Sequence, residues 1–364
     1  MRKFFLFAAA LCCAVMINAQ EIGTWSGFCK GAASFTFEGG APSHSSDGAS
    51  LFNKYGYTAS FYLVVNWAPD WAAFKALADM GHEIGSNSVS YPQDMTGEEK
   101  SSKDSINAHI TNHSCLTVAY SNCNIPNQTA VMQNYIAGRA CDFSGSAIIS
   151  IDGPSNWCDI KANMTGKSCD VNSTNAFTNL MQKAIQQGGW VVFGSWGFVG
   201  KKNGNATYSP TDLNAIEGAL QWAQHNDIWI APLRDVAMYI KERKAASFTE
   251  TSSTAASKTY SLTHSIADAV CAYQYPLSLR VPSNGWTDIE VSQAGKKLDS
   301  KIEGGDIYFD AIPNGGDIVV KISTEGIDQI TNGQSPRTNK FFRDGQLFIQ
   351  RGDKTYSITG QEVK

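Results

Sequence analysis

The sequence lacks the features that mark several functional classes. Only 17% of its residues are charged and the formal net charge is -4, so there is no basic excess for a nucleic-acid backbone. Its cysteines form no CxxC pair and no cluster with histidine, so no zinc-site spacing is present. Beyond the N-terminal segment, no apolar run reaches the about 20 residues of a membrane span. These absences argue against a nucleic-acid partner, a zinc module and a transmembrane protein.

The N-terminus has the pattern of a secretory signal peptide. Arg2 and Lys3 precede an apolar run from Phe4 to Ile17, and the small residue Ala19 precedes a polar start of the mature chain. We therefore expect residues 1–19 to be a signal peptide. The protein is then expected to be secreted or located at the cell surface.

Cysteines that follow this segment would meet an oxidising compartment, where disulfides are plausible. Seven remain once Cys12 and Cys13 are subtracted from the nine in the sequence. Because seven is odd, at least one thiol should be free. Short spacing makes Cys115–Cys123 and Cys158–Cys169 plausible pairs around loops, although the sequence alone leaves the connectivity open.

Residues 21–244 alternate strand-like and helix-like segments. The strand-like segments are apolar, which is typical of a parallel sheet covered by helices. Over this length we predict an α/β fold, a distorted (β/α) barrel. Active-site residues of such barrels lie at the C-terminal ends of the strands. The residues at the ends of the expected strands are Glu38, Asn66, Asn87, Tyr120, Asp152 and Trp196.

The rest of the chain is expected to be organised differently. Residues 245–258 are rich in Ser, Thr and Ala and are predicted to be a linker. Short alternating segments and Gly-rich turns predict a small all-β, sandwich-like domain over residues 259–322. Residues 339–364 are expected to form a short β tail, which could be a sorting segment or attach the protein to the cell surface.

Several blocks of the predicted barrel resemble NodB-like polysaccharide deacetylases, the carbohydrate esterase family four type. SFTFEGG, from Ser34 to Gly40, resembles the TFDDG block of that family. GHEIGSNSVSYP, from Gly81 to Pro92, resembles its GHEIG block with the HxxxHP histidines, and TVAYSNC, from Thr117 to Cys123, resembles its third block. The resemblance covers residues 25–244 and implies a barrel that removes acetyl groups from polysaccharides.

The resemblance also implies a divalent metal, held by an aspartate and two histidines, with a second aspartate as the base. Glu38 occupies the position of the base, and Gly39, Asn87 and Tyr91 occupy the three metal-ligand positions. Trp196 corresponds to the late histidine that acts as the general acid. Glycine has no ligand atom and a tyrosine hydroxyl deprotonates only near pH 10. We therefore predict no metal and no other cofactor.

A site without a metal but rich in aromatic rings is typical of carbohydrate binding. The sequence predicts a secreted protein that binds or acts on an acetylated polysaccharide or oligosaccharide. Glu38 is the candidate base. His44 follows the first block and could reach the mouth of the site or lie in a surface loop. The predicted substrate-binding residues are Asn87, Tyr91, Tyr120, Asp152 and Trp196, and the other aromatic residues expected at the mouth are Trp67, Trp71 and Trp157.

Two alternatives stay open at this stage. The chain could be an active carbohydrate esterase or N- or O-deacetylase with a non-standard site. It could also be a glycosidase-like hydrolase in which Glu38 and Asp152 form an acid and base pair.

Overall fold

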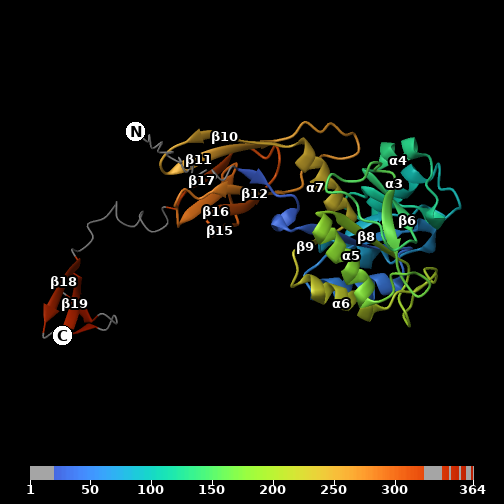
Figure 1. Cartoon of the computed structure of the whole chain (residues 1–364), viewed down its shortest axis with the longest axis horizontal. Helices are drawn as coiled ribbons and strands as arrows, with labels where there is room; N and C mark the ends of the chain where they lie inside the picture. The colour runs from blue at the N-terminus through green and yellow to red at the C-terminus, as the bar shows by residue number, and fades with distance from the viewer. Residues whose placement is uncertain (1–19, 324–337, 344–345, 352–353, 358–361, 364) are drawn as a thin grey trace, which may run out of the picture.

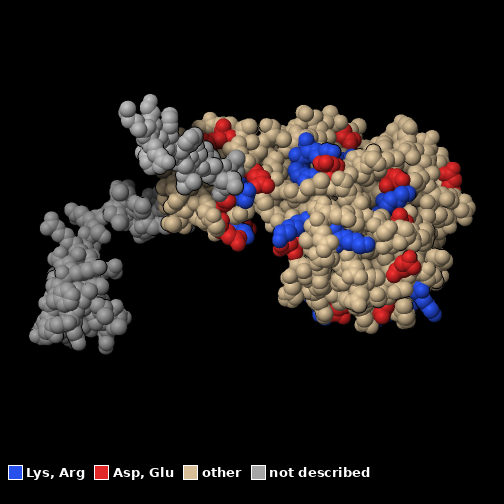
Figure 2. Space-filling view, viewed as in Figure 1, with Lys and Arg blue, Asp and Glu red and all other residues tan. Residues whose placement is uncertain are grey.

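The computed structural model describes residues 20–323, 338–343, 346–351, 354–357 and 362–363. The predicted signal peptide lies outside these ranges, and the predicted β tail lies partly outside them. Within them, no helix is both long enough and apolar enough to cross a membrane. Lysine, arginine and acidic side chains are interspersed on the face shown in Figure 2, which has no extended basic patch.

The N-terminal body is a parallel barrel surrounded by helices (Figure 1). Its sheet has the order β3-β4-β5-β6-β7-β8-β2-β9, and an additional pairing between β2 and β3 closes the ring. β9 pairs with the first half of β2, next to the ring. This arrangement confirms the predicted barrel. The strands are β2 (Gly31–Glu38), β3 (Ser60–Leu63), β4 (Glu83–Ser86), β5 (Thr117–Ala119), β6 (Ala137–Asp142), β7 (Ile160–Met164), β8 (Trp190–Ser195) and β9 (Ile228–Ile230).

The helices pack on the outside of the barrel and bury its outward-facing apolar side chains. Short helices also follow several strands at their C-terminal ends, where they shape the mouth of the barrel. The α-helices are α1 (Ala49–Lys54), α2 (Trp71–Asp79), α3 (Glu99–His109), α4 (Gln128–Asn134), α5 (Thr174–Gln187), α6 (Leu213–Ala223) and α7 (Leu233–Ala245), and the short helices are η1 (Ser26–Phe28), η2 (His44–Gly48), η3 (Val65–Trp67) and η4 (Ser121–Cys123).

The alternation of residues along β2 determines where Glu38 points. All eight residues of this strand are buried. Phe35 and Phe37 belong to the core between the sheet and the helices. Successive side chains of a strand point to opposite faces, so Thr36 and Glu38 face the inside of the barrel. Glu38 is the last residue of β2 and therefore lies inside the barrel at its C-terminal end.

One expectation about the barrel strands was wrong. Residues 147–151 were predicted to be a strand, but they contribute only an antiparallel bridge between Ile149 and Trp190. The strands in this part of the ring are β6 and β7 instead. Arg139 and Asn163 interrupt the apolar pattern of these two strands, and both side chains are buried inside the protein. The apolar pattern therefore favoured residues 147–151 as a strand over the observed strands β6 and β7.

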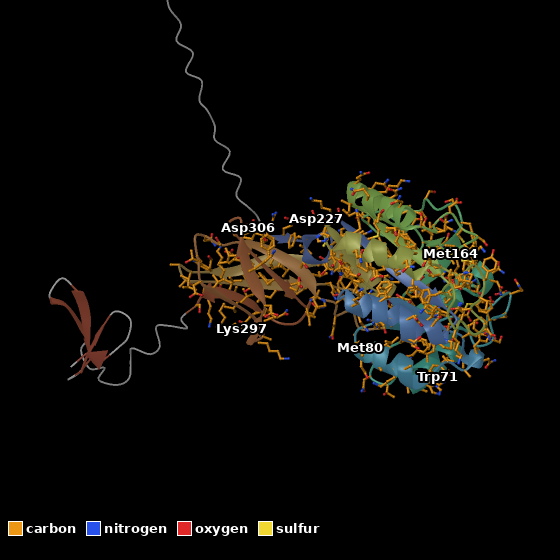
Figure 3. The ribbon with its side chains drawn as sticks, turned by 90° about the horizontal axis from the view of Figure 1, so that it is seen from below. Trp71, Met80, Met164, Asp227, Lys297 and Asp306 are labelled. Atoms are coloured by element: carbon orange, nitrogen blue, oxygen red, sulfur yellow. A yellow bond between two sulfur atoms is a disulfide. The ribbon has the colours of Figure 1, made fainter. Side chains whose placement is uncertain are left out.

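A β domain follows α7 and contains two antiparallel sheets with a shared apolar core. One sheet has the order β10-β11-β17-β13-β14 and the other β1-β12-β16-β15. Figures 1 and 3 show it beside the barrel, with α7 on the side of the barrel that faces it. Its strands are β1 (Glu21–Ile22), β10 (Ser247–Ser253), β11 (Ser257–Thr263), β12 (Leu277–Pro282), β13 (Ile289–Gln293), β14 (Lys296–Leu298), β15 (Ser300–Glu303), β16 (Asp306–Ala311) and β17 (Ile318–Ile322).

The predicted linker and the start of the predicted barrel need correction. Residues 247–253, inside the predicted linker, form β10 and pair with β11. β10 is an edge strand whose side chains are mostly exposed, so its polar composition looked like that of a linker. β1 lies at the start of the predicted barrel range but pairs with β12 of the β domain.

The described residues of the tail form a further antiparallel sheet, with the order β18-β19-β20-β21. Residues 339–364 were expected to form a short β tail, and the observed strands agree with that. The strands are β18 (Thr338–Arg343), β19 (Gln346–Arg351), β20 (Lys354–Ser357) and β21 (Glu362–Val363).

Candidate functional site

A cavity of about 480 Å³ opens at the C-terminal end of the barrel. Glu38 lies at its base, and loops that follow other strands supply the walls. Ligand sites of small molecules commonly measure 300–1,000 Å³, so the cavity has the size of a binding site. The residues that line it are Glu38, Trp67, Asn87, Tyr91, Gln93, Asn122, Cys123, Phe143, Trp196, Asn205, Ala206, Thr207 and Tyr208.

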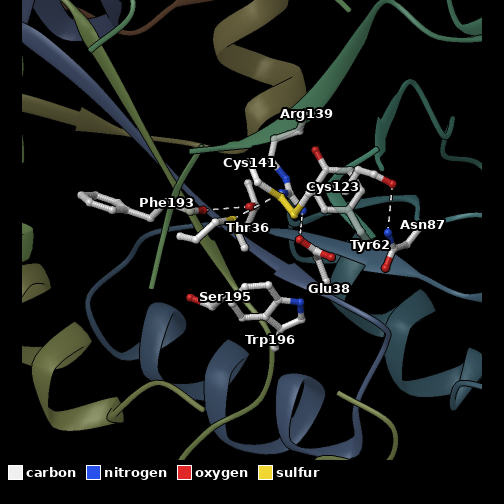
Figure 4. Close-up of polar contacts among 12 residues, drawn as sticks. Thr36, Glu38, Tyr62, Asn87, Cys123, Arg139, Cys141, Phe193, Ser195 and Trp196 are labelled. Carbon is white, nitrogen blue, oxygen red and sulfur yellow. Dashed lines mark hydrogen bonds and ion pairs between the residues drawn. A yellow bond between two sulfur atoms is a disulfide. The ribbon is translucent and has the colours of Figure 1, made fainter. Parts of the chain in front are cut away.

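An ion pair between Glu38 and Arg139 lies at the base of the cavity (Figure 4). Both side chains are buried, and Arg139 Nη2 donates to Glu38 Oε1. Glu38 Oε2 and Arg139 Nε have no hydrogen-bond partner among the described residues. Burial raises the pKa of Glu38, and the charge of Arg139 opposes that shift. The base of the cavity thus has one carboxylate oxygen without a partner.

Arg139 was not among the site residues predicted from the sequence. Its guanidinium also donates from Nη1 to Cys141 Sγ and Met164 Sδ, at 3.5 and 3.7 Å. The one signal in the sequence is a single arginine within the otherwise apolar stretch YIAGRAC. That signal indicates a buried charge but does not identify its partner, which lies 101 residues earlier.

Asn87 lines the same cavity and contains a buried acceptor without a partner. Its Nδ2 donates to the backbone carbonyl of Ala119 at 2.9 Å, which determines the orientation of the amide. Asn87 Oδ1 is consequently directed away from Ala119 and has no partner among the described residues. Buried polar atoms are nearly always hydrogen-bonded. The unpartnered oxygens of Asn87 and Glu38 are therefore suited to a ligand that donates hydrogen bonds.

Aromatic rings form the walls of the cavity. Trp67 lies against Tyr91, with ring centroids 4.8 Å apart. On the other side, Trp196 contacts Tyr208 edge to face at 4.8 Å and lies nearly parallel to Phe143 at 6.5 Å. Tyr208 and Phe143 are more than half exposed, at 61% and 52%. Exposed apolar rings beside buried polar groups are typical of sites that bind flat, partly polar ligands.

Several backbone positions around the cavity are strained. Tyr91, Asn122 and Cys123 have φ angles of 60°, 52° and 60°, in the left-handed region that residues other than glycine rarely adopt. A disulfide joins Cys123 to Cys141, beside Arg139 (Figure 4). Strained backbone is concentrated at functional sites, so these positions support the choice of this cavity.

The disulfide differs from the pairs that short spacing favoured. Cys123 follows β5 and Cys141 lies near the end of the adjacent strand β6, so the parallel pairing brings them to a Cα–Cα distance of 5.4 Å. Cys115, Cys158 and Cys169 are buried free thiols. Neighbouring parallel strands, not neighbouring loop residues, determined the pairing.

Two of the predicted substrate-binding residues do not line the cavity. Tyr120 is fully buried in the core, and its hydroxyl donates to the carbonyl of Cys158 at 2.7 Å. Asp152 lines a different cavity, together with Lys244. That cavity also contains Ile149, which pairs with Trp190 at the start of β8, whereas Trp196 follows the end of β8. Asp152 therefore lies at the opposite end of the barrel from Glu38, and the two cannot form a glycosidase pair.

Two of the aromatic residues expected at the mouth also lie elsewhere. Trp71 stacks on His109 between α2 and α3, with ring centroids 4.0 Å apart. Trp157 lies against Lys241 of α7, whose Nζ is 4.5 Å from the centre of its ring. Trp67, Tyr91 and Trp196 are the predicted aromatic residues that line the cavity.

His44 supports Trp196 from behind the cavity. The imidazole is fully buried; Nδ1 accepts from the backbone N–H of Ala41, and Nε2 lies 2.5 Å from the carbonyl of Trp196. This arrangement requires a neutral ring that donates from Nε2. Burial lowers the pKa of His44 to about 4. His44 is thus neither a surface histidine nor a residue of the cavity lining.

We predict that His44 contributes an acid sensitivity to the fold. Its pKa is about 4 in the folded protein, below the ordinary value of about 6.5, so the unfolded chain binds the proton first as the pH falls. The stabilisation is complete above pH 6.5 and is lost towards pH 4. Between pH 7 and pH 5, His44→Gln should lose about 2 kcal/mol less of unfolding free energy than the parent protein.

Urea unfolding at both pH values measures this difference. His225→Gln changes an exposed histidine and is the matched control, which should behave as the parent does. Burial raises the pKa of Glu242 to about 7, so this residue changes the free energy of unfolding with pH in the opposite direction. It is present in all three proteins and therefore does not affect the comparison. Equal pH dependence in His44→Gln and the parent would contradict the assignment of a buried neutral imidazole.

The side chains at this end of the barrel do not fit a divalent metal. No group of three or more His, Cys, Asp or Glu residues that could hold a metal ion occurs in the described part of the chain. A Cβ atom added to Gly39 would lie 2.6 Å from the ring of Trp67, so the ring covers the position of a second carboxylate. Arg139 places a positive charge beside Glu38, where it would repel a cation.

Tyr91 offers no better ligand than Gly39. Burial and the charge of Glu38 raise the pKa of its hydroxyl to about 12, so the phenol stays protonated at neutral pH. The Asn87 amide nitrogen is already engaged with Ala119, as described above. Only neutral oxygens remain beside Glu38, and a metal site normally needs several charged or imidazole ligands.

Comparison with known proteins adds family evidence. Residues 27–118 match the family model described as polysaccharide deacetylase. The chain is also 23% identical, over 344 residues, to a gellan lyase from a Bacillus species. That match covers 86% of this chain and 14% of the gellan lyase, so the chain spans only a small part of the curated relative.

Two solved structures give weaker similarities. One is the Xyl-CE4 domain of a multidomain xylanase from the hindgut metagenome of Trinervitermes trinervoides, at 15% identity and a TM-score of 0.40, with 59% of this chain and 91% of that chain covered. The other is a putative polysaccharide deacetylase from Mycobacterium smegmatis, at 10% identity and a TM-score of 0.44, with 65% and 99% covered.

Proposed function

Because the barrel belongs to the NodB-like polysaccharide deacetylase family, we propose that it is a secreted or cell-surface protein that binds a neutral polysaccharide without a catalytic metal. The observation that carries the proposal is that other residues occupy the three metal-ligand positions of the family. Trp67 covers Gly39, and the ion pair of Glu38 with Arg139 places a cationic group at the base of the cavity. Aromatic walls remain, and they suit the apolar faces of sugar rings.

The charge of the cavity favours a neutral glycan. Glu38 is the one charged residue of the lining, and Arg139 balances it. No lysine or arginine lines the cavity to attract an anionic chain such as gellan, the polysaccharide named for the Bacillus relative. Unsubstituted xylan oligomers are therefore suitable first probes, and gellan is the anionic comparison.

The unpartnered atoms favour a sugar with free hydroxyl groups. Glu38 Oε2 and Asn87 Oδ1 are acceptors, and a hydroxyl group can donate to either one. An acetyl ester presents only acceptor oxygens, which would face these two acceptors without a proton between them. The site is thus expected to prefer the unacetylated form of a glycan over the acetylated form.

We predict that xylotetraose binds more tightly than acetylated xylotetraose, and that Trp196→Ala weakens binding about 30-fold. Truncation of a tryptophan at a binding hot spot costs on the order of 2 kcal/mol, which corresponds to that factor. Titration calorimetry measures both effects. Trp71→Ala, on the outer surface between α2 and α3, is the matched control and should bind as the parent does.

Two results would contradict this proposal. If Trp196→Ala binds with the same affinity and the same number of sites as the parent protein, the glycan does not occupy this cavity. If the protein releases acetate from acetylated xylotetraose and Glu38→Gln abolishes the release, the barrel is an active esterase with Glu38 as its base, not a binding protein.

A further inference from the structure

A second cavity, of about 320 Å³, lies where the chain passes from the β domain to the barrel. It is formed by η1, which leads into β2, and by the sheet that contains β12, β16 and β15. This cavity shares no residue with the cavity of the barrel. Its lining residues are Gly27, Phe28, Ser278, Asp299, Ser300, Lys301, Tyr308, Phe309 and Asp310.

Two perpendicular aromatic rings form an apolar corner in this cavity. Phe28 and Tyr308 are half-buried, with ring centroids 5.2 Å apart and an angle of 89° between their planes. Phe28 has a φ angle of 59°, which is unusual for a bulky residue. The N–H of the preceding residue, Gly27, donates to Ser278 Oγ at 2.8 Å and anchors this turn to the β domain. The ring of Phe28 is therefore held at the cavity by a turn with an unfavourable backbone conformation.

Hydrogen-bonding groups surround the corner. Ser278 Oγ donates to Asp310 Oδ1 at 2.5 Å, which leaves Asp310 Oδ2 available in the exposed carboxylate. The side chains of Asp299 and Ser300 are exposed and make no hydrogen bond among the described residues. The Nζ of Lys301 lies 5.3 Å from the ring centre of Tyr308 and donates to Glu303 Oε2 at 2.6 Å, which leaves its other protons as donors. Acceptors that outnumber donors suit a ligand with several hydroxyl groups.

We infer that this cavity is a second glycan-binding site, which takes one or two sugar units of a neutral polysaccharide. A pyranose ring has apolar C–H faces for the corner of Phe28 and Tyr308, and hydroxyl groups at its edge for Asp299 and Asp310. Lys301 beside Tyr308 and Arg280, whose Cζ lies 5.8 Å from the ring centre of Phe28, balance the two carboxylates, which suits a neutral glycan. Since the two cavities lie on one chain, a polysaccharide that reaches both would bind more tightly than through either alone.

Titration of the full chain with xylotetraose tests this inference by the number of sites. The parent protein is expected to bind two molecules per chain. Tyr308→Ala should bind one, Trp196→Ala should bind one, and the double variant should bind none within the measured range. Lys297→Ala, an exposed change on β14 outside the cavity, is the control and should retain two sites (Figure 3).

Asp299→Asn keeps the side-chain volume and checks the result independently of packing changes around Tyr308. It should weaken the second site several-fold and leave the melting temperature unchanged. One site in the parent protein that folded Tyr308→Ala retains, or two sites in folded Tyr308→Ala, would overturn the second site. If Trp196→Ala retains two sites while Tyr308→Ala loses one, the proposed function of the barrel fails and the second site stands.

Discussion

Replacing Arg139 with methionine is expected to lower the free energy of unfolding by about 3–5 kcal/mol, because the change leaves a buried carboxylate without its counter-charge. The Glu38 side chain is 2% exposed and the Arg139 side chain is fully buried, so water cannot replace the lost partner. Protonation of Glu38 would remove the uncompensated buried charge in this variant. The loss of stability should therefore be larger at pH 8 than at pH 5.

Urea unfolding of the variants checks this result. The double variant Glu38→Gln/Arg139→Met should recover most of the lost stability, because it removes both charges. Lys30→Met breaks a fully exposed ion pair with Asp227 and should leave the stability unchanged. If Arg139→Met alone is as stable as the parent protein, the ion pair does not organise the base of the cavity.

Restoring a carboxylate at position 39 is expected to damage the fold and not to create a metal site. Gly39 has a φ angle of 101°, and an added Cβ would lie 2.6 Å from Trp67. Backbone strain costs about 1–3 kcal/mol and overpacking costs about 1–3 kcal/mol, so Gly39→Asp should lose about 2–6 kcal/mol. Arg139 would still repel a cation from this position.

Thermal unfolding and metal analysis of Gly39→Asp measure the two parts of this prediction. Gly56→Asp is the matched control, because Gly56 also has a positive φ but has no atom within 4 Å of an added Cβ. The difference between the two variants isolates the contact with Trp67. Stoichiometric zinc in a stable Gly39→Asp protein would contradict the view that Trp67 and Arg139 prevent metal binding.

Apolar strands bounded by helices made the barrel predictable. β3 and β8 are buried on both faces, and their sequences are mostly apolar. β6 and β7 were missed because polar residues interrupt their apolar patterns: Arg139 of β6 pairs with Glu38, and Asn163 of β7 donates to the backbone of Ala147 and Val192. Arg139 is the clearest example. Its charge makes β6 look unlike a buried strand in the sequence, and in the structure the same charge balances the buried carboxylate of Glu38.

The candidate site was partly predictable for a similar reason. Glu38, Asn87, Tyr91 and Trp196 follow strands that could be recognised, and all four line one cavity. Asp152 was misplaced because it follows an apolar segment that is not a barrel strand. Arg139 and the Cys123–Cys141 disulfide depend on which strands are neighbours, and the order of strands in a ring is not visible in local sequence.

Binding of a neutral glycan in the barrel cavity is expected to need no metal. The most direct test is a titration of the protein with xylotetraose before and after dialysis against EDTA, each repeated with added zinc. We predict the same affinity in all conditions, and the same loss of affinity in Trp196→Ala. Binding that disappears with EDTA and returns with zinc would contradict the claim.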